Sequence, residues 1–217
     1  DKYSAKVVVD EAHGVGVYGR ASGVRGTGVL AELELEQHPS LLSSVFTFGK
    51  AAGSHGAIAC FKTPEHRDYV LNFGYPLIYS TAPPLHLLAT IDCAYDRIIG
   101  NDGHMLRKQL RHNVKLFRSM LGPLLNATNG KLTLMDSDGA IQAIVVPGNN
   151  ACTELCQSIL DESPEAIRLF PIKSPTVAAG TERVRVVIHA HNTDDEILNL
   201  VECFSRVISR KIISSRL

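Results

Sequence analysis

The feature that most constrains the fold is a short apolar run that ends in a charged residue, Val7–Val9 followed by Asp10. Consecutive valines without polar alternation predict a strand that is buried on both faces, as in a parallel sheet. Open α/β sheets bind their ligands at the carboxyl ends of such strands, which is where Asp10 falls. The run therefore predicts an α/β fold with a polar site beside Asp10.

A second apolar run, Val45–Phe48, leads to Lys50. The residues around this lysine are small or polar: Gly49, Ala51, Ala52, Gly53, Ser54 and Gly56. A flat ligand could approach such a backbone closely. We expect the amine of Lys50 to be partly desolvated there, which favours the neutral form that reacts with carbonyl groups. From this stretch alone, Lys50 could also be an ordinary surface lysine that extends from a strand end into solvent and has no catalytic role.

The two stretches together suit pyridoxal 5'-phosphate (PLP). Lys50 would form a Schiff base with the cofactor, and Asp10 would keep the pyridine nitrogen protonated so that the ring accepts electrons. His13, three residues after Asp10, would lie beside the ring and its phenolic oxygen. The hydroxyl of Thr47 would bind the phosphate.

Four motifs, in this order, resemble those of the α-oxoamine synthase family, and its biotin-pathway members most closely: Asp10–Gly14, Thr47–Ala51, Ile78–Pro84 and Ser174–His191. The resemblance implies a PLP-dependent transferase of fold type I, the aspartate-aminotransferase-like α/β fold. It also implies the reaction, in which an amino acid, L-alanine, condenses with an acyl-CoA and loses carbon dioxide to give an α-amino ketone. Lys50 would be the base for the α-proton, and His13 would donate a hydrogen bond to the acyl oxygen.

The resemblance also implies a homodimer with sites at its interface. Ser80 and Thr81 would reach the phosphate of the partner subunit's cofactor, although their spacing equally predicts a helix cap ahead of Pro83. Arg185 would bind the substrate carboxylate with its planar guanidinium group, and Thr176 would contact the substrate.

Several alternatives stay open at this point. Lys173 stands where biotin-pathway enzymes tend to have arginine, which leaves the acyl group open, and a glycine C-acetyltransferase or sphingoid-base synthase activity is the alternative within enzymes. An inactive, truncated paralogue that binds a full-length subunit is a further possibility. Asp10–His13 also lies in a run that matches the magnesium-binding strand of DEAH-box helicases, but the chain has no basic stripe for nucleic acid.

Composition limits the partners and the compartment. Twenty-two basic and 22 acidic side chains cancel, which argues against nucleic acid or an anionic membrane as the main partner. The five cysteines are scattered and predict reduced thiols and no metal site. The final tripeptide, Ser215–Leu217, resembles a peroxisomal address, so the protein is expected in peroxisomes or the cytoplasm. The first methionine is Met105, and we expect the chain to be the C-terminal part of a longer protein.

Periodicity and turn residues predict two domains, the C-terminal part of a PLP-binding domain over 1–122 and a small α/β domain over 123–217. The predicted strands are Leu41–Phe48, Ala57–Phe61, Ile141–Val146, Ile167–Pro171 and Arg183–His189. The predicted helices are Val29–Gln37, a helix that opens at Pro64, Leu85–Ile99, Leu106–Leu121, Thr153–Leu160 and Asp194–Ser209.

Overall fold

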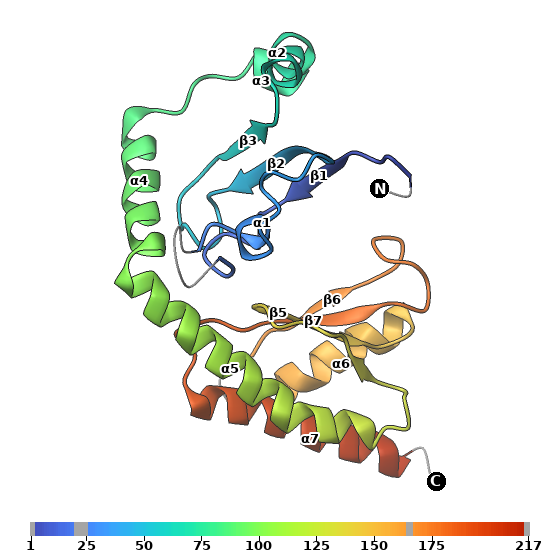
Figure 1. Cartoon of the computed structure of the whole chain (residues 1–217). Coiled ribbons are helices and arrows are strands. Elements are labelled where there is room, and N and C mark those ends of the chain that lie inside the picture. The colour runs from blue at the N-terminus through green and yellow to red at the C-terminus, as the bar shows by residue number, and fades with distance from the viewer. Residues whose placement is uncertain (1–2, 20–25, 164–166, 215–217) are drawn as a thin grey trace. The chain divides into compact units, whose positions relative to one another are not determined.

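The structure is a computed structural model that describes residues 3–19, 26–163 and 167–214. The chain forms two compact units, residues 1–107 and 108–217, and the division falls inside a long helix (Figure 1). The domain boundary predicted at residue 122 stays a prediction. The tripeptide Ser215–Leu217 lies outside the described residues, as does Arg20–Arg25, which is part of a glycine-rich run over residues 14–28.

The first unit contains a three-stranded sheet in the order β1-β2-β3. Strand β1 (Val7–Asp10) pairs in parallel with β2 (Leu41–Thr47), and Asp10 lies opposite Val45. Strand β3 (Ala57–Phe61) runs antiparallel to β2 and lies at the far edge (Figure 1). The predicted parallel strand is confirmed, but its predicted full burial is wrong. Val8 is 58% exposed, because β1 is an edge strand of a small sheet with few neighbours to cover it.

Four helices belong to the described part of this unit alone: α1 (Val29–Glu32), α2 (Pro64–Phe73), α3 (Tyr75–Ile78) and α4 (Leu85–Ile99). The predictions for α4 and for the start of α2 are confirmed. Helix α1 is shorter than predicted because Glu34 adopts a left-handed backbone with φ 59°, and Leu35 N–H then donates to the carbonyl of Leu30 at 2.9 Å. This is the hydrogen bond of a Schellman-type helix end.

Helix α5 (Asn101–Asn126) begins earlier and ends later than predicted. The turn residues at 100–103 predict a break between two helices; the break is present but is confined to Gly100, the C-cap of α4, and Gly103 lies within α5. A Cβ on Gly103 would lie 2.2 Å from the carbonyl oxygen of Ile98. The glycine therefore permits a close approach between α5 and the end of α4. The helical spacing of Leu106, Leu110, Val114, Phe117 and Leu121 predicts one apolar stripe. The last four are buried, but Leu106 is 49% exposed.

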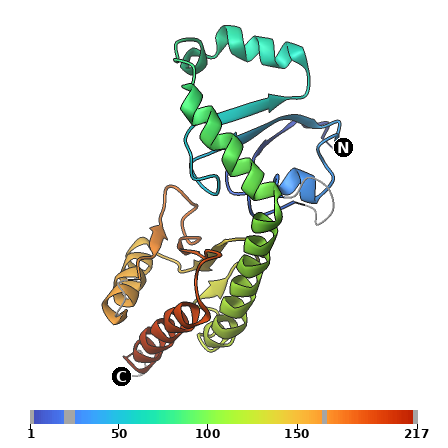
Figure 2. The ribbon, with the colours of Figure 1, turned by 90° about the vertical axis from the view of Figure 1, so that its left-hand side faces the viewer.

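The second unit is a four-stranded antiparallel sheet in the order β4-β5-β7-β6, with helices on one face (Figure 2). Its strands are β4 (Thr133–Leu134), β5 (Ile141–Val145), β6 (Phe170–Ile172) and β7 (Arg183–Val187), and its further helices are α6 (Asn149–Glu162) and α7 (Asp194–Ser214). Strand β4 was not predicted, and β6 lies three residues after its predicted start.

The start of α7 is a capping box, which the spacing of Thr193 and Glu196 in the sequence predicts. Glu196 N–H donates to the hydroxyl of Thr193 at 3.2 Å, and Thr193 N–H donates to the carboxylate of Glu196 at 3.0 Å. The predicted apolar face of α7 is buried: Ile197, Leu200, Val201, Phe204 and Ile208. Within the described residues, no helix combines the length and apolarity needed to cross a membrane.

Candidate cofactor site

The parallel pairing of β1 and β2 brings the predicted cofactor residues to one edge of the sheet. Asp10 ends β1, and Thr47 ends β2 two residues beyond the partner of Asp10. His13 follows in the turn after β1, and Lys50 in the loop after β2. Four of the predicted site residues therefore come from the carboxyl ends of two adjacent strands, the place where α/β sheets bind ligands.

Lys50 lies in a closed loop between β2 and β3. Phe48 N–H donates to the carbonyl of Gly56 at 3.0 Å, and Ser54 N–H donates to the carbonyl of Phe48 at 2.7 Å. The carbonyl of Lys50 accepts a hydrogen bond from Gly53 N–H at 3.0 Å. Gly53 has φ 59°, a conformation that glycine adopts at little cost. The backbone around the lysine is thus fixed by its own hydrogen bonds.

Helix α4 packs against this loop. The rings of Phe48 and Tyr95 meet edge to face at 6.1 Å, and the hydroxyls of Ser54 and Thr90 are 3.0 Å apart. These two contacts attach the loop to α4.

The side chain of Lys50 is exposed, so the expected partial desolvation is wrong for the chain as described. The reason is the small sheet: β3 is largely exposed, and Gly49 and Ala51 on either side of the lysine are exposed as well. Nothing in the immediate backbone covers the amine.

The hydroxyl of Thr47, unlike the amine of Lys50, is shielded from solvent. Its hydroxyl oxygen is buried, and it has no hydrogen-bond partner among the described residues. Buried hydroxyls are normally paired, and an unpaired one points to a missing ligand or water. The carboxylate of Asp10 has a local partner, since Ala12 N–H donates to its Oδ1 at 2.8 Å.

Glu11 was not singled out in the sequence, although it is the most buried acidic side chain near this edge at 1% exposure. Its two carboxylate oxygens accept hydrogen bonds from Val29 N–H at 2.8 Å and Leu30 N–H at 2.7 Å. A Cβ on Gly14 would lie 1.9 Å from Oε2 of Glu11, and a Cβ on Gly28 would lie 2.5 Å from the same atom. The glycine-rich run after Asp10 was the signal that could have revealed this buried carboxylate.

Ser80 and Thr81 follow α3 and are exposed. The hydroxyl of Ser80 donates to the carbonyl of Leu77 at 2.8 Å. The alternative that these residues cap the next helix is wrong, because α4 has Pro84 at its N-cap and no side-chain cap. Their role at a partner subunit's cofactor stays a prediction.

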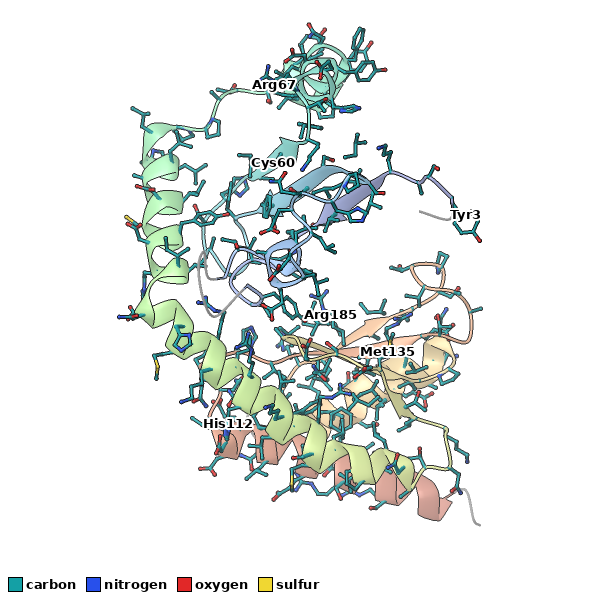
Figure 3. All side chains as sticks on the ribbon, in the orientation of Figure 1. Tyr3, Cys60, Arg67, His112, Met135 and Arg185 are labelled. Carbon is teal, nitrogen blue, oxygen red and sulfur yellow. The ribbon has the colours of Figure 1, made fainter. Side chains whose placement is uncertain are left out.

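The predicted substrate residues lie in the second unit. Arg183 and Arg185 share one face of β7, as the alternation predicts, and Arg185 is labelled in Figure 3. Arg183 donates to the carbonyl of Thr181 at 3.1 Å and to the sulfur of Met135 at 3.2 Å. The Nε of Arg185 is buried and has no hydrogen-bond partner among the described residues. Of the two arginines, Arg185 is the one with an unused buried donor.

The loop that carries Thr176 is held at both ends. The side chain of Asn149 accepts a hydrogen bond from Ser174 N–H at 2.9 Å and donates one to the Ser174 carbonyl at 3.3 Å. The carboxylate of Glu182 accepts hydrogen bonds from Gly148 N–H and Gly180 N–H, each at 2.9 Å. These N–H groups, Gly148 first, hold the pKa of Glu182 below its usual value.

The described residues contain no group of three or more His, Cys, Asp or Glu side chains that could hold a metal ion. All five cysteines are free. Burial, with Cys152 nearby, raises the pKa of the Cys156 thiol to about 11. Cys156 is therefore a thiol at neutral pH and not a reactive thiolate.

The residues present fit PLP. The unpaired buried hydroxyl of Thr47 offers a donor for a phosphate, and the carboxylate of Asp10 offers an acceptor for a pyridinium N–H. The amine of Lys50 is accessible to a carbonyl group.

Comparison with known proteins supports the assignment of this strand edge to a PLP-dependent family. The family model for aminotransferase class I and II matches residues 1–204. An 8-amino-7-oxononanoate synthase from Emericella nidulans is 35% identical over 205 residues, which are 94% of this chain and 46% of the relative. The chain spans about half the length of the curated relatives that it matches.

Comparison with solved structures also places the chain among PLP-dependent enzymes of this fold. A high-resolution structure of SPT with PLP superposes with a TM-score of 0.76 at 25% identity, over 96% of this chain and 49% of that one. An 8-amino-7-oxononanoate synthase from Francisella tularensis superposes with a TM-score of 0.72 at 25% identity, over 94% of this chain and 55% of that one. The resemblance drawn from the four motifs and the expected α/β fold of type I are confirmed.

Proposed function

The chain belongs to the aminotransferase class I and II family, and we propose that it is part of a PLP-dependent α-oxoamine synthase of the 8-amino-7-oxononanoate synthase type. The substrates are an amino acid, L-alanine, and an acyl-CoA, and the product is an α-amino ketone for biotin synthesis. The observation that carries the proposal is the shared edge of β1 and β2, where Asp10, Thr47 and Lys50 lie at adjacent strand ends.

Each residue of this edge has a separate task. With PLP bound, Lys50 would hold the cofactor through its Nζ and would later accept the α-proton of the amino acid. Asp10 would accept a hydrogen bond from the pyridinium nitrogen and so favour its protonated form. The hydroxyl of Thr47 donates to the phosphate, and His13 donates to the acyl oxygen as negative charge develops there. PLP, when bound, supplies the electron-accepting ring that stabilises the α-carbanion.

The condensation balances as follows. The α-proton of alanine moves to Lys50, the α-carbon forms a bond to the acyl carbonyl carbon, and the bond from that carbon to the CoA sulfur breaks. The carboxylate of the amino acid then leaves as carbon dioxide, and the α-carbon takes a proton back from the protonated amine of Lys50. The CoA sulfur leaves as a thiolate and takes its proton from solvent. Arg185, whose buried Nε has no partner among the described residues, binds that carboxylate, and Thr176 contacts the substrate.

A sister activity is the second candidate. The similarity to SPT favours a serine- or glycine-using sphingoid-base synthase or glycine C-acetyltransferase as the alternative to an alanine-using enzyme. Release of CoA from one acyl-CoA with alanine, glycine or serine in turn separates these activities. An inactive paralogue would release CoA with none of them.

Assembly and location are part of the proposal. We propose that the protein forms a homodimer in which Ser80 and Thr81 reach the partner subunit's cofactor, and that it is located in peroxisomes, through Ser215–Leu217, or in the cytoplasm. Sedimentation analysis with and without PLP, and localisation with and without the last three residues, test these two points separately.

The main test is an absorbance titration of the purified chain with PLP. We expect a visible band that borohydride bleaches, that disappears in Lys50→Ala and that persists in Lys131→Ala, a control that removes another exposed lysine. A folded chain without such a band, or a band that survives Lys50→Ala, would contradict the proposal that these residues build the cofactor site.

A further inference from the structure

Glu11 lies between two proposed cofactor residues, Asp10 and His13, but its side chain points away from solvent and is 1% exposed. Burial of a carboxylate is costly unless hydrogen bonds compensate for the lost water. Here the compensation comes from Val29 N–H and Leu30 N–H, at 2.8 and 2.7 Å. The side chain therefore ties the residue after β1 to the start of α1.

The backbone of Glu11 makes further connections. Its N–H donates to the carbonyl of Val45 on β2 at 2.8 Å, and its carbonyl accepts from Gly14 N–H at 2.8 Å and Val15 N–H at 3.1 Å. One residue thus contacts β2, the turn after β1 and the start of α1. A side-chain substitution would keep the backbone bonds to β2 and the turn but would weaken the link to α1.

The carboxylate also determines where the chain must be glycine. A Cβ on Gly14 or Gly28 would overlap the carboxylate, so both residues pass directly over it. Between them, Gly16 has φ 78° and packs so closely on the lysine loop that its Cβ would lie 2.6 Å from the Cβ of Ala51. Ala51 is the residue that follows Lys50.

We propose that Glu11 is a positioning residue that fixes the Lys50 loop through the contact of Gly16 with Ala51. The inference deepens the proposed function and rests on it for the role of Lys50. The mechanical coupling between Glu11 and the loop can be measured without cofactor.

The first test is amide hydrogen exchange of the cofactor-free chain, for wild type and Glu11→Gln. The glutamine keeps the size of the side chain but replaces one acceptor oxygen with an NH₂ group that faces an N–H donor. We expect the Gly53 and Ser54 amides to exchange about tenfold faster, the effect of losing one buried hydrogen bond. Glu36→Gln, on an exposed side chain, is the matched control and should leave these amides unchanged.

Exchange that rises only over residues 14–19 and 26–30, with the Gly53 and Ser54 amides unchanged, would refute the coupling. The Lys62 amide, which donates to the carbonyl of Leu42 at 3.0 Å, reports unfolding of the first unit as a whole, so an equal rise there would make Glu11 a general stability residue and also count against the proposal.

The second test uses a compensating pair. Gly16→Ala adds a Cβ where Ala51 already lies, and we expect the same faster exchange at Gly53 and Ser54. Adding Ala51→Gly removes the overlap, so the double variant should recover part of the protection, although the positive φ of residue 16 still disfavours alanine. No recovery would show that the Gly16–Ala51 contact does not carry the effect.

PLP titration then links the loop to the cofactor. We expect about a tenfold higher Kd for PLP in Glu11→Gln, with the visible band unchanged in position at saturation. Failure of the proposed function would appear as a wild-type chain without a Lys50-dependent band. Failure of this inference would appear as unchanged exchange at Gly53 and Ser54, whatever PLP does.

Discussion

Thr47→Val separates the stability of the cofactor site from its function. The hydroxyl of Thr47 is buried without a hydrogen-bond partner among the described residues, at the end of β2. Valine has nearly the same shape and is as well suited to a strand, but it has no polar atom to desolvate. The same substitution should therefore have opposite effects on stability and on PLP affinity.

The magnitudes follow from the state of the hydroxyl. A buried polar group without a partner costs about 1–3 kcal/mol, so its removal should raise the free energy of unfolding of the cofactor-free chain by about 1 kcal/mol. A hydrogen bond to a charged group contributes about 1.5–3 kcal/mol, which corresponds to a Kd for PLP that is roughly 10- to 100-fold higher in the variant.

Urea unfolding without PLP measures the first effect, and the absorbance titration measures the second. Thr133→Val is the control, because Thr133 lies exposed in β4 and should change stability by no more than about 0.5 kcal/mol. A loss of stability in cofactor-free Thr47→Val would show that the hydroxyl is paired, and an unchanged Kd would show that it does not bind the phosphate. Either result refutes the reasoning.

Three further predictions concern the second unit. Thr193→Ala removes the capping-box hydroxyl and should cost about 1 kcal/mol in urea unfolding, whereas Thr63→Ala, at a helix start without a side-chain cap, should cost less. Phe204→Ala leaves a cavity at a side chain with 0% exposure and should cost about 3–5 kcal/mol, while exposed Leu106→Ala should stay within about 0.5 kcal/mol. The pKa of the Glu182 carboxyl is lowered from 4.5, so the stability that this carboxylate contributes is present above pH 4.5 and is lost as the pH falls through the lowered pKa. The acid side of a curve of stability against pH should therefore be shallower for Glu182→Gln than for wild type. Identical acid sides would contradict this prediction.

Strong local signals made part of the fold predictable. Helix α4 was predicted with its observed bounds because Pro84 and Gly100 mark its two ends. The capping box of α7 was predictable because Thr193 and Glu196 have the spacing that two reciprocal hydrogen bonds require. In the candidate site, the positions of Asp10 and Lys50 near strand ends were predictable because each follows an apolar run.

The remainder depends on contacts between distant residues. Glycine has a low helix propensity, yet Gly103 lies within α5, where the carbonyl of Ile98 leaves no room for a Cβ. Glu11 resembles any acidic residue after a strand until Val29 and Leu30 are brought to it. The exposure of Lys50 could not be predicted from its small neighbours, because the size of the sheet around it decides how much solvent reaches the amine.

The mixed sheet also sets an order of events during folding. Strands β2 and β3 are joined only by residues 48–56, so the hairpin that carries Lys50 closes over a short contour. Strand β1 must reach β2 across residues 11–40, and longer loops cost more entropy to close and form later. We therefore expect the β2–β3 hairpin with Lys50 to form first and β1 with Asp10 to pair with it afterwards.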